Sequence, residues 1–310
     1  MRLITVSLLI AAAASAQTAG RPAVRSHITT IDIHGKGKRV ALSVERLFEA
    51  PNWSPDGKYL LLNSQGRLWR LPPEGGEPQP VDTGAVKAIN NDHGISADGK
   101  WFAISAGQMY VLPSAGGTPR QVTKLTPSYF HGWSPDGRTL VYCASRGSNF
   151  DLYAIPAEGG EEKRLTMHAG YDDGPDYSPD GKWIYFNSDR SGSWDIWRIP
   201  ATGAGPDDAL AERITSDDYE DWFPHPSPDG KWLALISFAK GTKGHPANQN
   251  VILRRMRMPP AAAKAKPGKI GEVVRLFGGQ GTLNVNSWAP KGNRFAYVSY
   301  ELIGSAPPAR

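Results

Sequence analysis

A short phrase, Ser-Pro-Asp-Gly, recurs along the chain and constrains its fold more than any other feature of the sequence. Its copies lie roughly 40 to 60 residues apart, which is the spacing of β-propeller blades. Four copies are intact, the second has alanine in place of proline, and the last is degenerate. They occupy residues 54–57, 96–99, 134–137, 178–181, 227–230 and 289–292. A catalytic motif normally occurs once, so a phrase that recurs in this way describes architecture.

The chemistry of the phrase predicts a tight turn between two antiparallel strands. Proline presets φ at the second position, aspartate bonds the neighbouring backbone, and glycine accepts positive φ at the exit. We therefore interpret the aspartates of these turns as turn formers and not as acid/base groups.

The remainder of each repeat predicts the rest of a four-stranded blade. An apolar run follows the turn, then an alternating strand that ends in small residues, then a short polar strand. The sixth repeat stops after its second strand, at residues 295–302, and residues 27–43 carry the missing third and fourth strands. We expect an all-β, six-bladed β-propeller whose last blade is closed by the N-terminal strands, which hides both sheet edges.

The N-terminus has the layout of a secretory signal peptide. Arg2 precedes an apolar run that ends in Ala14-Ser15-Ala16, and this run is too short to span a membrane comfortably. We expect residues 1–16 to be removed, residues 17–310 to form a single propeller domain, and the mature protein to be periplasmic or secreted. Cys143 is the only cysteine, so no intrachain disulfide can form.

The repeated phrase and the segment FNSDRSGSWDIWRIP (186–200) resemble the TolB-like β-propeller family. Its namesake is the periplasmic partner of the Tol–Pal envelope system. The resemblance implies a six-bladed propeller and an envelope partner. Because the repeats begin shortly after the predicted cleavage site, we expect the N-terminal α/β domain of TolB to be absent. Asp189 and Arg190 within this segment are predicted to form a structural pair, the alternative being that Arg190 contacts a ligand.

Irregular loops on a rigid scaffold usually carry binding function, and here they are the crossovers from one blade to the next. The regular turns share one face of the ring, so we expect the crossovers to form the working face. Acidic and aromatic side chains gather in two adjacent crossovers, and these could hold a cation or a hydroxyl-rich ligand. The alternative is that they are solvated caps and turn formers. The residues are Tyr171, Asp172, Asp173, Asp176, Asp217, Asp218, Tyr219, Glu220, Asp221 and Trp222.

Three histidines form a second candidate site. His93 and His131 each stand three residues before the serine of their turn, and His225 stands two residues before its own. Histidines that converge on a channel could ligate a transition metal, as in oligogalacturonate lyases, which resemble this chain in having a propeller. The alternative is that they are hydrogen-bonded side chains lining a wet channel.

Two functions from different classes fit these observations. The first is an exported, non-catalytic propeller that binds an envelope protein, a peptide or a glycan at its channel mouth. The second is a metal-dependent polysaccharide lyase or glycoside hydrolase with its site at the same mouth. We favour binding, because the sequence contains no complete catalytic set. We expect no cofactor, apart from a divalent metal at the channel mouth under the second hypothesis. The net charge of +5 is small and dispersed, so we expect no nucleic-acid partner, and we expect no transmembrane segment after signal cleavage.

Overall fold

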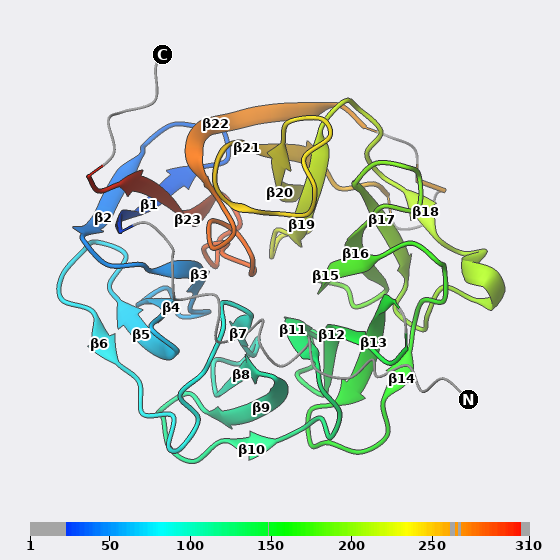
Figure 1. Cartoon of the computed structure of the whole chain (residues 1–310), viewed down its shortest axis with the longest axis horizontal. Helices are drawn as coiled ribbons and strands as arrows, with labels where there is room; N and C mark the ends of the chain where they lie inside the picture. The colour runs from blue at the N-terminus through cyan, green and yellow to red at the C-terminus, as the bar shows by residue number, and fades with distance from the viewer. Residues whose placement is uncertain (1–22, 148, 261–263, 266–267, 305–310) are drawn as a thin grey trace, which may run out of the picture.

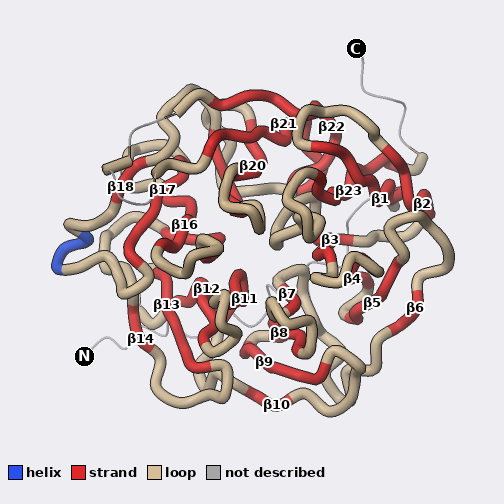
Figure 2. Tube along the Cα trace, turned by 180° about the vertical axis from the view of Figure 1, so that it is seen from behind, coloured by secondary structure: helices blue, strands red, loops and turns tan. Residues whose placement is uncertain are grey.

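The computed structural model describes residues 23–304, apart from residue 148 and residues 261–263 and 266–267. Its strands form six sheets arranged in a ring, as Figure 1 shows from one face and Figure 2 from the other. The first strand of each repeat lies nearest the ring axis, and later strands lie progressively further out. The predicted all-β, six-bladed propeller is confirmed. The predicted signal peptide lies outside the described residues.

Blades 1 to 3 follow one another along the chain, and each is a four-stranded antiparallel sheet. Blade 1 consists of β3 (Glu49–Trp53), β4 (Leu60–Ser64), β5 (Arg67–Leu71) and β6 (Gln79–Pro80). Blade 2 consists of β7 (His93–Ile95), β8 (Trp101–Ala106), β9 (Gln108–Pro113) and β10 (Arg120–Gln121). Blade 3 consists of β11 (Ser128–Trp133), β12 (Thr139–Ser145), β13 (Phe150–Pro156) and β14 (Lys163–Arg164).

Blades 4 and 5 have the same design, and blade 6 joins the two ends of the chain. Blade 4 consists of β15 (Asp172–Tyr177), β16 (Trp183–Ser188), β17 (Asp195–Pro200) and β18 (Glu212–Arg213), with a short 3-10 helix, η1 (Pro206–Asp208). Blade 5 consists of β19 (Glu220–Pro226), β20 (Trp232–Phe238), β21 (Ala247–Arg257) and β22 (Ile270–Gly279). Blade 6 consists of β23 (Arg294–Leu302), β1 (Val24–Asp32) and β2 (Arg39–Val44).

The N-terminal strand closes the ring, as the sequence predicts. β1 pairs antiparallel with β23 over its whole length, from Val24 opposite Leu302 to Asp32 opposite Arg294. The other blades have their first strand at the innermost position, but blade 6 has residues 282–289 there. These residues form no regular strand, and they are joined to β23 by an isolated bridge between Trp288 and Phe295. The glycine-rich entry to this segment favours turns over an extended strand.

The repeated turns use their side chains locally, as expected. In blade 1 the Ser54 hydroxyl donates to Asp56 Oδ1 at 2.7 Å and accepts from the Tyr59 amide at 3.0 Å. The same two bonds recur in blades 2 to 5. Gly57 has a φ of +78° and its amide donates to the Ser54 carbonyl, a conformation that glycine adopts without strain. These aspartates therefore stabilise turns.

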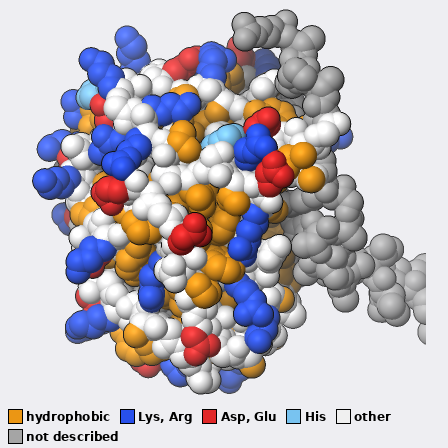
Figure 3. Space-filling model, turned by 90° about the vertical axis from the view of Figure 1, so that its left-hand side faces the viewer, with side chains coloured by type: hydrophobic (Ala, Val, Ile, Leu, Met, Phe, Trp, Pro, Cys, Tyr) orange, Lys and Arg blue, Asp and Glu red, His pale blue; other side chains and the backbone are white. Residues whose placement is uncertain are grey.

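The outer surface of the ring carries no single-sign patch on the side seen in Figure 3. Basic, acidic and apolar side chains are interspersed there. None of the helical segments in the described part of the chain has the length and apolarity of a membrane span.

Candidate functional site

In blades 1 to 5 the inner strand reaches its Ser-Pro-Asp-Gly turn with one of two sequence patterns. Blades 1, 4 and 5 have proline three residues before the turn serine, and each has a polar residue next to it: Asn52, Asp176 and His225. Blades 2 and 3 have histidine at the first of these positions and glycine at the second: His93-Gly94 and His131-Gly132. Each of these blades thus supplies one polar side chain, from one position or the other.

Backbone bulges accompany the proline pattern. The pairing register of β3, β15 and β19 shifts at these prolines, which cannot donate to the sheet ladder, and that of β11 shifts at His131 without a proline. The residues just before the prolines, Ala50, Gly174 and Phe223, have φ of +54°, +61° and +52°. Positive φ costs an alanine or a phenylalanine free energy, and such strain often accompanies functional positions. The bulges re-aim the side chains that follow.

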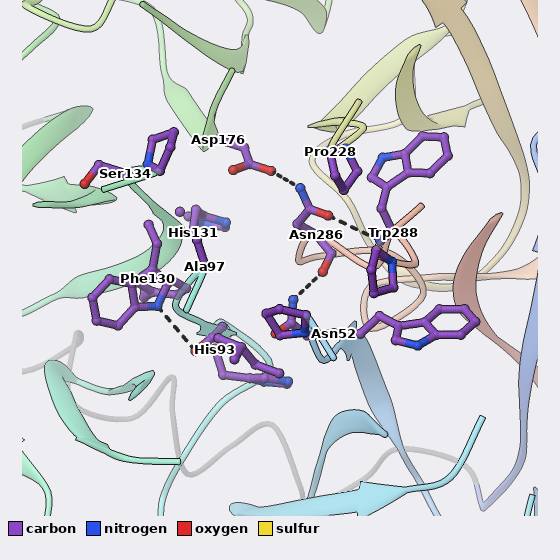
Figure 4. Close-up of a pocket in the computed structure, with 18 residues that line it drawn as sticks. Asn52, His93, Ala97, Phe130, His131, Ser134, Asp176, Pro228, Asn286 and Trp288 are labelled. Carbon is purple, nitrogen blue, oxygen red and sulfur yellow. Dashed lines mark hydrogen bonds between the residues drawn. The ribbon is translucent and has the colours of Figure 1, made fainter. Parts of the chain in front are cut away.

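A cavity of about 320 Å³ lies among these residues, at the end of the channel where the turns are. Figure 4 shows His93 and His131 on one side of it, facing Asn286 and Trp288. Turn residues of five blades form its rim: Pro55, Ala97, Pro135, Pro228 and Pro290. Its walls and floor include Asn52, Trp53, His93, Phe130, His131, Trp133, Asp176, Asn286 and Trp288. The cavity is therefore at the opposite end of the channel from the crossovers that the sequence favoured.

His131 and Asp173 form a buried ion pair beneath the cavity. His131 Nε2 lies 3.1 Å from Asp173 Oδ1, and His245 Nε2 lies 3.7 Å from Oδ2. Burial lowers the pKa of His131, but the hydrogen bond and charge of Asp173 outweigh this and raise the pKa overall. Burial alone would raise the pKa of Asp173, yet His131 and His245 bring it below its ordinary value. His131 is thus held towards its charged form.

Asp176 belongs to a second buried network. Its Oδ2 accepts from Asn286 Nδ2 at 2.9 Å and lies 3.0 Å from His225 Nδ1. His225 Nε2 lies 3.1 Å from the Leu283 carbonyl, so both ring nitrogens are used. Asn52 donates to the Asn286 carbonyl, which ties blade 1 to the irregular inner segment of blade 6. Gly132 lets β11 approach closely, since a Cβ there would lie 3.1 Å from Asp176 Oδ1.

Three buried polar atoms around the cavity have no hydrogen-bond partner among the described residues: Asn52 Oδ1, His93 Nδ1 and His131 Nδ1. Asp176 also lines the cavity, and its contacts with His225 and Asn286 both use Oδ2. His93 is fully buried, its Nε2 lies 3.3 Å from the Leu61 carbonyl, and burial lowers its pKa to about 4. His93 is therefore neutral, with its proton on Nε2 and a lone pair on Nδ1. Polar atoms left without partners in a formed cavity suit a ligand.

Asp92 adds a further carboxyl behind His131, and we predict that it lowers stability near neutral pH. Burial raises the pKa of Asp92 to about 6. A folded-state pKa above the unfolded value means that ionisation opposes folding, a cost that grows as pH rises from about 4 to 6. Asp92→Asn should therefore raise the free energy of unfolding by about 3 kcal/mol at pH near 7.5.

The pH dependence checks this prediction. The gain should shrink steadily as urea unfolding is repeated towards pH near 4.5, because Asp92 then becomes neutral in the wild type as well. Asn90 Nδ2 donates to Asp92 Oδ2 at 2.5 Å, and the amide oxygen of the substituted side chain could still accept that bond. A gain that is independent of pH, or no gain, would contradict the assignment.

The acidic crossover residues predicted as a cluster divide among separate partners. Asp172 pairs with Arg190 at 2.7 Å, and Asp221 pairs with Arg254 at 2.5 Å. Arg190 therefore pairs with Asp172 and not with its neighbour Asp189, whose Oδ1 instead accepts from the Tyr171 amide. Asp217 also pairs with Arg254. The structure brings Asp173 and Asp176 into the channel and leaves these other acids outside it.

The remaining crossover residues pack or cap. Glu220 accepts from the amides of Trp194 and Gly241 at 2.8 and 2.7 Å, and Asp218 forms an exposed pair with Lys240. The Tyr171 ring stacks on Phe150 with centroids 4.9 Å apart. Trp222 is fully buried, with its ring centroid 3.9 Å from that of Trp194. Each of these four side chains contacts other residues of the protein.

The predicted histidine triad does not share one ligand position. His93 contacts the Leu61 carbonyl, His131 contacts Asp173, and His225 contacts Asp176. Over the described ranges, no group of three or more His, Cys, Asp or Glu side chains is arranged to hold a metal ion. Asn52 and Asn286 are site residues that the sequence reasoning missed. Asn52 could have been found from its proline-polar pattern, whereas Asn286 lies in an irregular segment.

The comparisons with known proteins agree with this architecture. Residues 102–259 match the TolB beta propeller domain family. An uncharacterized protein of Agrobacterium fabrum is 48% identical over 284 residues, which cover 89% of this chain and 93% of that protein. The structure of a candidate TolB from Agrobacterium tumefaciens is 48% identical, with a TM-score of 0.83 over 90% of this chain and 99% of that chain.

A more distant likeness extends the shared fold. TolB from Acinetobacter baumannii is 18% identical, with a TM-score of 0.57 over 79% of this chain and 65% of that one. Both the family match, which spans half of the chain, and the close relatives lead to the same assignment. The chain belongs to the TolB β-propeller family.

Proposed function

We propose that this protein is a non-catalytic, exported propeller that binds an extended peptide segment of an envelope protein. The observation that carries the proposal is the cavity of about 320 Å³ with unpartnered polar atoms at the turn end of the channel. Its volume is at the lower end of ligand pockets, which is enough for one or two side chains of a partner. The rest of the segment would lie across the surrounding turns.

The composition of the cavity supports a peptide. Seven of the eighteen lining residues are tryptophan or proline, and a few polar groups lie among them, the combination typical of specific binding pockets. The rim consists of hydrogen-bonded turns, so it is already formed and binding requires little ordering of this protein.

The cavity favours binding over catalysis. His131 and Asp173 resemble a base with its orienting carboxylate, but nucleophilic catalysis also needs a hydroxyl or thiol beside the base. The hydroxyl of Ser134, a lining residue, donates to Asp136, and the Cys143 thiol donates to the Asp172 carbonyl. Neither group is available to His131 in this arrangement.

The rim provides a direct test through Ala97, which stands where the other five turns have proline. Ala97 is exposed and borders the cavity, so Ala97→Trp should obstruct the entrance without disturbing the core. A phage-displayed library of random dodecapeptides would be selected on immobilised wild type. We expect enriched peptides whose binding falls at least about tenfold, or 1.4 kcal/mol, on Ala97→Trp.

Ala115→Trp is the matched control. Ala115 is an exposed alanine in the turn after β9 of the same blade, and it is not among the residues that line the cavity. The enriched peptides should bind this variant as they bind wild type. Failure to enrich any sequence, or equal binding to all three proteins, would refute peptide binding in the cavity.

Export is a separate part of the proposal, and it rests on the sequence of residues 1–16. Full-length protein expressed in a Gram-negative host should appear in the periplasmic fraction with Gln17 as its first residue. Retention in the cytoplasm with an intact N-terminus would argue against it.

A further inference from the structure

Most buried carboxylates outside the channel have an arginine partner, while Glu220 instead accepts from two backbone amides. Arg190 pairs with Asp172 and Asp208 at 2.7 and 3.1 Å. Further pairs are Arg164–Asp151, Arg213–Asp195 and Arg254–Asp221, at 2.5 to 2.7 Å. A buried charge is costly unless it is paired, and this fold repeatedly meets the requirement with arginine.

The carboxylates in the channel depart from this pattern. Asp173 contacts histidines, Asp176 contacts a histidine and an asparagine, and Asp92 accepts from Asn90. Among the described residues no lysine or arginine forms an ion pair with any of these three aspartates. These three carboxylates therefore have only histidine and asparagine partners, and no permanently charged side chain balances them.

The unpartnered atoms are complementary to a donor. Asn52 Oδ1 and the Nδ1 of neutral His93 are unpartnered hydrogen-bond acceptors, and the Asp176 carboxylate from a third blade borders the same cavity. Asn52 and His93 are more than nine-tenths buried. A guanidinium or ammonium group carries several N–H donors together with the positive charge that the channel lacks.

We infer that the bound segment inserts a basic side chain, an arginine or a lysine, into the cavity towards Asp176. This inference rests on the proposed function, whose peptide it makes specific. His131 Nδ1, the remaining unpartnered atom, would donate to a carbonyl oxygen of the same peptide. An organic cation suits the site better than a metal ion, because the side chains that face the cavity do not form a metal-ligand set among the described residues.

A pair of small probes tests the charge requirement. N-acetyl-arginine amide and N-acetyl-citrulline amide have nearly the same shape, but only the first is charged. Each would be titrated into isotopically labelled mature protein, and amide and histidine ring signals would be followed by NMR. We expect the arginine amide to bind at least about tenfold more tightly than the citrulline amide, and to shift signals from Gly94, Gly132 and Asp176.

Two variants locate the effect. Asp176→Asn should remove most of the preference for arginine over citrulline, while its far-ultraviolet circular dichroism and thermal midpoint report whether it is folded. Asp136→Asn is the matched control, because Asp136 is an exposed turn carboxylate near the same rim that contacts Ser134 and the Arg138 amide. It should keep the full preference.

The outcomes separate this inference from the proposed function. Equal binding of the two amides, or an arginine preference that survives in Asp176→Asn, would overturn the inference. If peptides selected on the wild type are blocked by Ala97→Trp but contain no basic residue whose change to citrulline weakens them, peptide binding stands and the basic side chain does not. Calcium binding that requires Asp176, with no response to the arginine amide, would also overturn it.

Discussion

Arg190→Ala should lower the free energy of unfolding by about 3–5 kcal/mol, the loss expected when one partner of a buried ion pair is removed. The Arg190 side chain is 5% exposed and serves both Asp172 and Asp208, whose side chains are also buried. Burial already raises the pKa of Asp172 to about 6. Without the guanidinium, two carboxylates would remain unpaired in a poorly solvated place.

Urea unfolding at several pH values measures this effect and tests its cause. The deficit should be largest near pH 7.5 and smaller near pH 5, because protonation relieves an unpaired carboxylate. Lys240→Ala, which breaks the exposed pair with Asp218, should leave the unfolding midpoint unchanged within error. A loss below about 1 kcal/mol for Arg190→Ala would contradict the structural role assigned to Asp172.

Trp222→Ala should cost about 3–5 kcal/mol, as expected for truncating a large, fully buried aromatic side chain. Trp222 packs against Trp194, Phe223 and His245, and it belongs to the cluster that joins blades 5 and 6. The sequence placed this residue in a ligand site. Its burial instead predicts that the variant loses stability and keeps its affinity for a cavity-bound peptide.

The control for Trp222 is a tryptophan of the surface. Trp101 is 43% exposed, so Trp101→Ala should change the free energy of unfolding by less than about 1 kcal/mol. Peptide binding would be measured at a temperature at which each variant is folded. A stable Trp222→Ala protein that no longer binds selected peptides would restore the crossover site.

The fold could be predicted because each blade repeats the same local chemistry. Ser54 and Asp56 form their turn bonds within a few residues, and the serine–aspartate pattern is visible five times in the sequence, with a degenerate sixth copy. The closure by β1 could be predicted too, since the last repeat lacks two strands that the N-terminus supplies. The conformation of residues 282–289 was harder to predict, because this inner segment of blade 6 is held by individual contacts and not by a regular ladder of strand hydrogen bonds.

The site was only partly predictable, and the reason is geometric. The sequence singled out His93, His131 and Asp176, which line the cavity, and Asp173 and His225, which contact His131 and Asp176. It could not show that Asp172 and Asp173, adjacent in the chain, point to different surroundings. Alternation along a strand sends one to Arg190 and the other to His131. Pairing with arginines that are distant in the sequence then accounts for Asp172, Asp217 and Asp221.

The central claim is that the peptide binds at the turn end of the channel and not at the crossover end. The most direct test is to measure the affinity of one selected peptide for two variants, each of which blocks one end. Ala97→Trp obstructs the turn end, and Asp218→Trp adds the same bulk to the exposed crossover end. We predict at least about a tenfold rise in the dissociation constant for Ala97→Trp and less than about a twofold rise for Asp218→Trp. The reverse order would contradict the account and place the ligand at the crossovers.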